Sequence, residues 1–257
     1  MRSTCITLYG LLLCLLVWGC TQDAPQKGQD DKGLLIFCGI TMIDPVKELM
    51  LTFERQTGIK STMSYGGSAD LLHSIQVNKA GDIYFPGAES FIADADKAGI
   101  LRARRVVGHN QAALFVQKGN PKGLTGSLQE LTKPDVRLAI GHPDLGSIGK
   151  ESYDILTRKG IYDNMMAAAA MLLPDSKALS AALKEGKVDV VINWKPVLLI
   201  GDNAKYMDML PLHDVEAKRH ELTMATTKFS ASPEAAEKFL AFCASEQGRG
   251  VFEKYGF

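Results

Sequence analysis

The sequence lacks the features that define several large classes of protein. Its 257 residues include only 5 cysteines, too few for a fold held together by disulfide bonds. Basic and acidic residues balance at 29 each, so no overall positive field exists to attract nucleic acid. After residue 19, no apolar run reaches the length of a membrane-spanning helix. The remaining composition, 46% hydrophobic, is that of a globular chain with one large domain or two smaller lobes.

The signature motifs of several enzyme classes are also missing. The five histidines are scattered without the spacing of a metal site. The sequence contains neither the Gly-x-Ser-x-Gly turn of hydrolases nor the phosphate-binding loop of ATPases. We therefore expect a protein that is not an enzyme, with no catalytic residues, no cofactor and no direct site for a metal cation.

Residues 1–19 have the pattern of a secretory signal peptide. Arg2 supplies a basic start, and residues 6–19 form an almost wholly apolar run, too short for a comfortable membrane span. The run ends in Leu-Val-Trp-Gly-Cys, which resembles a bacterial lipobox and implies that Cys20 is lipidated; an ordinary signal peptide with an incidental cysteine is the alternative. Residues 20–32 are polar and indicate a flexible tether. We expect a periplasmic or cell-surface protein that is anchored to the membrane through Cys20.

Two cysteines remain beyond this segment. Cys38 and Cys243 could form a disulfide in an oxidising compartment, or they could be two buried free thiols. The distance between them decides which, and the sequence leaves both readings open.

From residue 33 onward, short apolar runs alternate with segments of helical periodicity. Asp44 and Pro45 are typical of the start of a helix, as are Ser68 after two glycines and Ser232 before Pro233. Gly58 and Gly186 are typical helix ends. This alternation predicts an α/β fold with largely parallel sheets. The predicted strands lie at residues 33–38, 60–65, 82–85, 112–117, 137–140, 188–193 and 222–227.

Several segments resemble the periplasmic molybdate-binding protein family of ABC importers. They are residues 35–45 (LIFCGITMIDP), 64–68 (SYGGS), 80–83 (AGDI), 116–121 (VQKGNP), 133–141 (KPDVRLAIG) and the carboxyl-terminal stretch 239–257. The resemblance implies a type II periplasmic-binding-protein fold, in which two lobes joined by two hinge crossings close on a ligand in the cleft. Lobe 1 would hold residues 33–113 and 217–257, and lobe 2 would hold residues 114–216.

The resemblance also implies a site in the first lobe. Thr41 and Ser68 occupy the places of the family's two ligand-binding serines, and both hydroxyls can donate a hydrogen bond. Helix N-termini nearby offer unpaired N–H groups and a partial positive charge to an anion. Gly87 stands in a loop that departs from the family's Ser-Ala-Asp pattern, but its N–H could still reach the ligand.

In the second lobe, Gly146 and Ser147 precede a helix at the place of a backbone donor in the family. Trp194 stands where the family has a tyrosine that contacts the ligand, and its indole N–H can donate but cannot accept. Local turn, capping or packing roles are the alternatives for these residues.

These implications lead to a functional hypothesis. The chain is expected to be a monomeric solute-binding lipoprotein of an ABC importer, whose partners are the membrane permease and a small oxyanion, molybdate or tungstate, with no role for nucleic acid. The alternatives are another anion on the same fold (sulfate, a phosphonate or a small organic acid), or an enzyme or ligand sensor built on it.

Overall fold

The computed structural model describes residues 33–212 and 218–257. The predicted signal peptide, Cys20 and the tether up to residue 32 lie outside these residues, as does the segment that holds the predicted lobe boundary at 216/217. Among the residues that are described, no helix has the length and apolar character needed to cross a bilayer.

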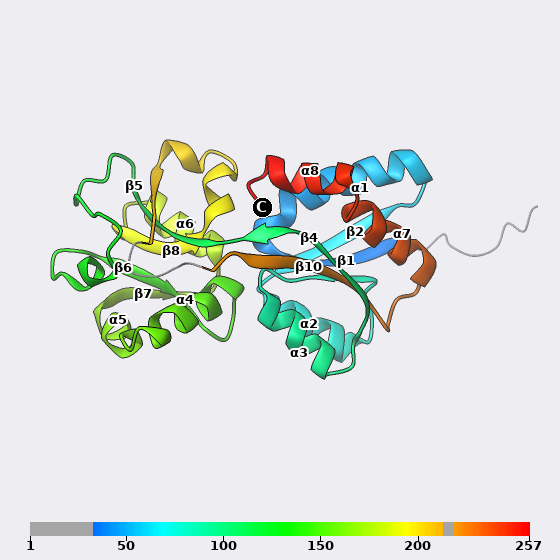
Figure 1. The fold of residues 1–257 in the computed structure, drawn as a ribbon, viewed down its shortest axis with the longest axis horizontal. Helices are drawn as coiled ribbons and strands as arrows, with labels where there is room; N and C mark the ends of the chain where they lie inside the picture. Colours follow the sequence, from blue (N-terminus) through cyan, green and yellow to red (C-terminus); the bar gives the residue numbers. More distant parts are fainter. Residues whose placement is uncertain (1–32, 213–217) are drawn as a thin grey trace, which may run out of the picture. The chain divides into compact units, whose positions relative to one another are not determined.

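Two five-stranded sheets organise the compact unit that ends at Phe257, and helices cover both faces of each (Figure 1). The first sheet has the order β2 (Ser61–Gly66), β1 (Leu34–Gly39), β3 (Ile83–Phe85), β10 (His220–Thr227) and β4 (Leu101–Asn110). The second has the order β7 (Ala169–Leu173), β6 (Leu138–Gly141), β8 (Val190–Trp194), β5 (Ala112–Gln117) and β9 (Met207–Leu210). We call the two halves lobe 1 and lobe 2.

Both sheets are mixed rather than largely parallel. In lobe 1, β1 runs parallel to β2 and β3, whereas β10 pairs antiparallel with β3 and β4. In lobe 2, β6 runs parallel to β7 and β8, whereas β5 pairs antiparallel with β8 and β9. The antiparallel strands are those next to the crossings between the lobes. The first crossing is Gln111, so the whole of β5 from Ala112 onward belongs to the second sheet.

In lobe 1, alternate residues of β1 serve opposite faces of the sheet, as the two-residue period of a strand requires. Ile36 packs with Phe53 and Phe239 under helices α1 (Ile43–Thr57), α7 (Pro233–Cys243) and α8 (Glu246–Lys254). Phe37 packs with Leu72 on the other face, under α2 (Ser68–Asn78) and α3 (Glu89–Lys97). Figure 1 shows these two groups of helices on either side of the sheet.

In lobe 2, helices α4 (Ser147–Arg158) and α5 (Tyr162–Ala168) cover one face of the sheet, and α6 (Ser176–Lys184) covers the other (Figure 1). Four short 3-10 helices complete the described part of the chain: η1 (Ile40–Met42), η2 (Leu128–Thr132), η3 (Lys195–Leu199) and η4 (Asn203–Lys205).

Local details correct three sequence predictions. Asp44 lies inside the first turn of α1 and does not cap it, because η1 runs directly into that helix. Ser68 is the first residue of α2, and Gly67 is its N-cap. The pattern Trp194-Lys195-Pro196 also predicts the start of a helix, and the structure has only the short 3-10 helix η3 there.

Cys38 and Cys243 are both free and fully buried in the core of lobe 1. Burial raises the pKa of both thiols, so they stay protonated. They act there as small apolar side chains.

Candidate functional site

A small cavity lies where the two lobes meet, at the ends of strands and the starts of helices. Its volume is about 10 Å³, near the lower limit for a single water molecule. Lobe 1 contributes three segments to the lining, around Thr41, Ser68 and Gly87, and lobe 2 contributes the segments around Ser147 and Ser176. Five of the six residues predicted for the site line this cavity: Thr41, Ser68, Gly87, Gly146 and Ser147.

Helix starts without side-chain caps face the cavity from both lobes. Gly67 precedes α2 and Gly146 precedes α4, and within the described part of the chain neither helix has a side-chain cap. The 3-10 helix η1, which begins after Gly39, is also uncapped. The first N–H groups of a helix have no partner inside the helix, so these groups are available to an anion.

Ser68 is almost completely buried, and its hydroxyl is held by a backbone donor. The N–H of Gly87 donates to Ser68 Oγ at 3.2 Å. The position of the α2 start is fixed as well, because the Tyr84 hydroxyl donates to the Ser68 carbonyl at 3.0 Å. Since Ser68 Oγ accepts a hydrogen bond, its own hydrogen is left to donate to another acceptor. In this arrangement the N–H of Gly87 orients Ser68, and a contact between that N–H and a ligand stays a sequence prediction.

Ser147 is held in a corresponding way in lobe 2. The indole N–H of Trp194 donates to Ser147 Oγ at 3.1 Å, which again leaves the hydroxyl hydrogen to donate. Trp194 is fully buried and does not line the cavity. It is therefore a candidate positioning residue that acts through Ser147, and its direct contact with a ligand remains a sequence prediction.

Thr41 is buried and lies on η1 between the cavity and a larger chamber. Its hydroxyl donates to the sulfur of Met42, with Oγ1 and Sδ 3.0 Å apart. A thioether is a weak acceptor, so an anionic oxygen would replace it readily.

The start of α6 is a part of the site that the sequence analysis did not identify. Asp175 and Ser176 line the cavity, and Asp175 is the only charged residue among the described residues that do so. Its Oδ1 accepts from the N–H of Ala178 at 2.9 Å, so the carboxylate caps α6. The Asp-Ser pair at a predicted helix start was the available signal, but only tertiary structure brings it beside Gly146.

The lobes touch closely around the cavity. A Cβ atom placed on Gly67 would lie 2.6 Å from the carbonyl oxygen of Leu145, and one on Gly87 would lie 2.4 Å from Ser147 Oγ. Both distances are too short for real contacts, so only glycine permits this approach at either position. We conclude that this arrangement is closed, and that a tetrahedral oxyanion needs more room than it provides.

The start of β10 lies beside the same helix that carries Ser147. Opposite Asn110, at the start of β10, His220 Nε2 lies 2.9 Å from Glu151 Oε2 of α4. Glu151 is buried, and its other oxygen has no hydrogen-bond partner within the described part of the chain. The His220 ring also packs edge-on against the Trp194 ring. These contacts couple the start of β10 to the lobe 2 half of the site.

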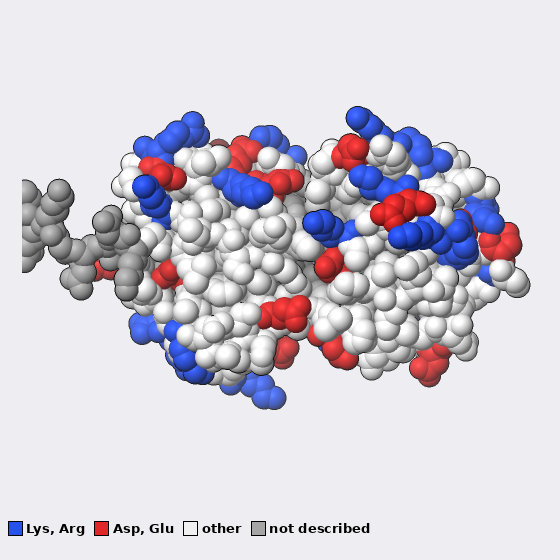
Figure 2. Space-filling model, turned by 180° about the vertical axis from the view of Figure 1, so that it is seen from behind, with Lys and Arg blue, Asp and Glu red and all other residues white. Residues whose placement is uncertain are grey.

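Positive and negative side chains on the surface do not separate into patches of one sign on the face that Figure 2 shows. On the face seen in Figure 2, basic and acidic side chains are interspersed over both lobes. Lys195, which follows Trp194, does not line the cavity, and its ammonium group donates to the side-chain oxygen of Gln111 at the first crossing. In residues 33–212 and 218–257, no group of three or more His, Cys, Asp or Glu side chains could hold a metal ion.

Comparisons with known proteins place the chain in a family. Residues 34–257 match the bacterial extracellular solute-binding protein family, and the chain belongs to it. A Bacillus subtilis relative, provisionally named as an ABC transporter substrate-binding lipoprotein, is 25% identical over 98% of this chain and 96% of its own length.

Solved structures share the fold at low sequence identity. The periplasmic molybdate-binding protein of Azotobacter vinelandii superposes with a TM-score of 0.72 at 19% identity, over 87% of this chain and 97% of that one. The periplasmic binding protein AfuA of Actinobacillus pleuropneumoniae, solved with fructose-6-phosphate, gives a TM-score of 0.76 at 15% identity, over 87% and 82%. The chain therefore has the two-lobed α/β fold of periplasmic binding proteins, as its sequence predicted.

Proposed function

We propose that this chain is the solute-binding lipoprotein of an ABC importer and that it captures a tetrahedral oxyanion, molybdate or tungstate, between its lobes. Family membership and the named Bacillus relative support the transport role, in which a membrane permease receives the ligand. The structural neighbours carry different ligands, among them molybdate, sulfate and a sugar phosphate, so the choice of anion rests on the site itself.

One observation carries the proposal. Each lobe presents a serine at a helix start, and each serine oxygen already accepts an N–H, from Gly87 to Ser68 and from Trp194 to Ser147. Both hydroxyls are therefore set to donate toward the same cavity, where uncapped helix N-termini add further donors. The described residues that line the cavity include no lysine or arginine, and the one carboxylate, that of Asp175, caps α6. Such a site, rich in donors, suits an anion held by neutral dipoles.

Closure would follow from the ligand's differential affinity. An oxyanion that accepts hydrogen bonds from both serines binds lobes drawn together around it, with slightly more room than the present arrangement provides, better than lobes held apart, and so shifts the population toward closure. The permease would then recognise the closed form.

The test is thermal unfolding of the purified protein with molybdate, tungstate, sulfate and phosphate in turn. Ligand at about a thousand times its dissociation constant should add about 4 kcal/mol to the free energy of unfolding. Ser68→Ala should weaken molybdate binding by roughly 10- to 100-fold, because a hydrogen bond to a charged group is lost.

The matched control is Ser74→Ala, the same change on the same helix but away from the cavity. It should leave binding unchanged. No stabilisation by molybdate or tungstate would contradict their assignment, and stabilisation by sulfate or phosphate alone would reassign the ligand.

A further inference from the structure

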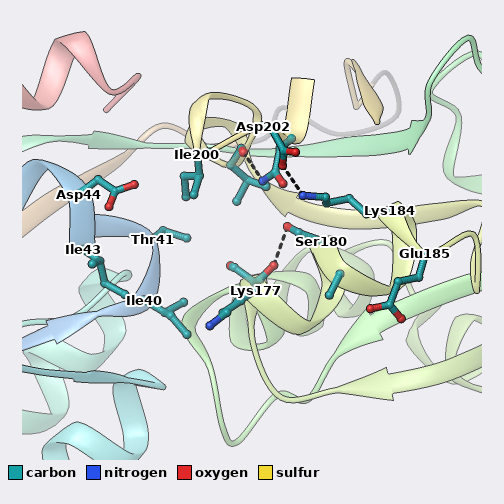
Figure 3. A pocket seen from close by; sticks show the side chains of 15 residues that line it. Ile40, Thr41, Ile43, Asp44, Lys177, Ser180, Lys184, Glu185, Ile200 and Asp202 are labelled. Atoms are coloured by element: carbon teal, nitrogen blue, oxygen red, sulfur yellow. Dashed lines mark hydrogen bonds and ion pairs between the residues drawn. The ribbon is translucent and has the colours of Figure 1, made fainter. Parts of the chain in front are cut away.

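A second and larger chamber lies beside the oxyanion cavity, also between the lobes. Its volume is about 470 Å³, within the range of small-molecule sites. Lobe 1 lines it with η1 and the start of α1, and lobe 2 lines it with α6, η3 and η4. Figure 3 shows these two sets of side chains facing each other across the gap.

The chamber and the cavity share part of their walls. Ile40, Thr41 and Ser176 line both spaces, so a molecule held in the cavity would need to pass only these residues to extend into the chamber. A free tetrahedral anion such as molybdate would occupy the cavity and leave the chamber empty. The chamber therefore offers room for a group that is attached to an anionic head.

The lining is mainly apolar. Ile40 and Ile43 contribute from lobe 1, and Ala181, Val197 and Ile200 contribute from lobe 2. Apolar surface that is drawn together from two lobes is stabilised when an apolar group fills the space between them.

Charged residues line the chamber from both lobes. Lys184 is neutralised by Asp202, and Glu185 is paired with Lys187. Lys177 and Asp44 form no hydrogen bond or ion pair with any described residue; in Figure 3 the Lys177 side chain extends from α6 toward Ile40, whereas Asp44 belongs to lobe 1. Lys177 directly follows Ser176, so its positive charge stands near the boundary between the two spaces, where it favours the anionic head, and the negative charge of Asp44 lies on the wall formed by lobe 1.

We propose that this chamber holds the organic body of a monosubstituted oxyanion, such as a phosphonate or a phosphate monoester, whose anionic head occupies the cavity between Ser68 and Ser147. This inference rests on the oxyanion site proposed above and deepens it. The ligand class is a small organic phosphonate or phosphate ester with a compact apolar substituent.

The experiment compares methylphosphonate with phenylphosphonate by isothermal titration calorimetry on the purified protein, with molybdate as the reference for the head-group site. Phenylphosphonate should bind at least tenfold more tightly than methylphosphonate, because only the phenyl group reaches the apolar walls. Ala181→Phe should fill the chamber and remove that advantage, while methylphosphonate binding stays within about twofold of the unsubstituted protein.

Ala178→Phe is the matched control. It places the same side chain one turn earlier on α6, at a position that is also partly exposed but does not line the chamber. It should preserve the preference for phenylphosphonate. Retained methylphosphonate binding also shows that Ala181→Phe is folded.

Each remaining outcome is decisive. Equal affinity for the two phosphonates, or equal loss of both in Ala181→Phe, would overturn the chamber as a substituent site. Binding of molybdate without either phosphonate would overturn this inference and leave the proposed function intact. Failure of every oxyanion to bind would instead overturn the proposed function.

Discussion

In each lobe, one buried aspartate joins a central pair of parallel strands. The two aspartates make the same two contacts. In lobe 1, the Asp82 N–H donates to the Leu35 carbonyl, and Asp82 Oδ2 accepts from the Leu35 N–H at 2.7 Å. In lobe 2, Asp189 makes the same pair of contacts with Arg137, and its Oδ2 accepts from the backbone N–H at 2.9 Å. Both carboxylates are buried.

The other carboxylate oxygen of each aspartate, Oδ1, has different hydrogen-bond donors in the two lobes. Asp82 Oδ1 accepts from the Ser230 hydroxyl and from the N–H groups of Ala231 and Ser232, which ties β3 to the loop before α7. Asp189 Oδ1 instead accepts from the half-exposed guanidinium of Arg137 at 2.6 Å.

The same contrast appears at the site. Ser68 is oriented by a backbone N–H, and Ser147 is oriented by the indole of Trp194. Lobe 1 uses the main chain of neighbouring segments, whereas lobe 2 uses single long side chains. A substitution of Trp194 can therefore remove the donor that orients Ser147. In lobe 1 the donor is the backbone N–H of Gly87, which no substitution by another amino acid with an N–H removes, so only Ser68 itself can be changed.

The largest effect is expected from removing Asp82, the aspartate that joins the two parallel strands in lobe 1. Asp82→Ala should lower the free energy of unfolding by about 3 kcal/mol, because it leaves buried backbone donors of two segments without an acceptor. Asp189→Ala should cost less, about 2 kcal/mol, because the Arg137 side chain can turn to water. Urea unfolding at pH 7 measures both, and a larger loss for Asp189→Ala would contradict the comparison.

The corresponding aspartate of lobe 2, Asp189, also predicts a pH dependence of stability. The hydrogen bond that Asp189 accepts from Arg137 holds the pKa of Asp189 below the ordinary value of 3.8. The stability it contributes is therefore complete above about pH 4 and is lost as the pH falls through the lowered pKa. The deficit of Asp189→Ala should stay constant from about pH 7 to about pH 4.5 and shrink only below that. A deficit that already shrinks near neutral pH would contradict this assignment.

A third prediction concerns the approach of the lobes. Gly67→Ala places a Cβ atom against the Leu145 carbonyl and should hold the lobes apart, which weakens oxyanion binding by about tenfold or more. Gly250→Ala is the matched control, since its Cβ atom would meet no atom within 4 Å and Gly250 lies on α8, away from the cavity, so affinity should change little. Calorimetry measures affinity, and small-angle scattering with ligand measures closure. If the Gly67→Ala protein with ligand is as compact as the unsubstituted protein, the contact between residue 67 and the Leu145 carbonyl does not limit how closely the lobes approach.

The smallest effect tests the donor in lobe 2. Trp194→Phe removes the N–H that orients Ser147 and should weaken oxyanion binding by about fivefold, near the net value of one neutral hydrogen bond. In a Ser147→Ala background the same substitution should have almost no effect on affinity, because the group it orients is gone. Equal effects in both backgrounds would show that Trp194 acts independently of Ser147.

Much of the fold could be predicted from local pattern. The buried strands β1, β3, β5, β6 and β8 are apolar runs, and helix starts such as Ser147 and Pro233 carry their usual signals. Three strands were missed, namely β4, β7 and β9. In β4, Arg102, Arg104 and Arg105 mask the alternation, and β7 consists of alanine, methionine and leucine, which favour helix. All three are edge strands, whose conformation is decided by pairing with a neighbour.

The candidate site likewise has features that the sequence predicted and features that it did not. The loops that carry donors could be predicted from the sequence, because glycine, serine and threonine before a helical segment leave N–H and hydroxyl groups at its start. Three features emerge only from the folded chain: Gly87 and Trp194 orient serines, Asp175 and Ser176 join them, and an apolar chamber opens beside Thr41. The reason is physical: a helix start is set by neighbouring residues, whereas the partner of a hydroxyl and the space between two lobes depend on segments far apart in the chain.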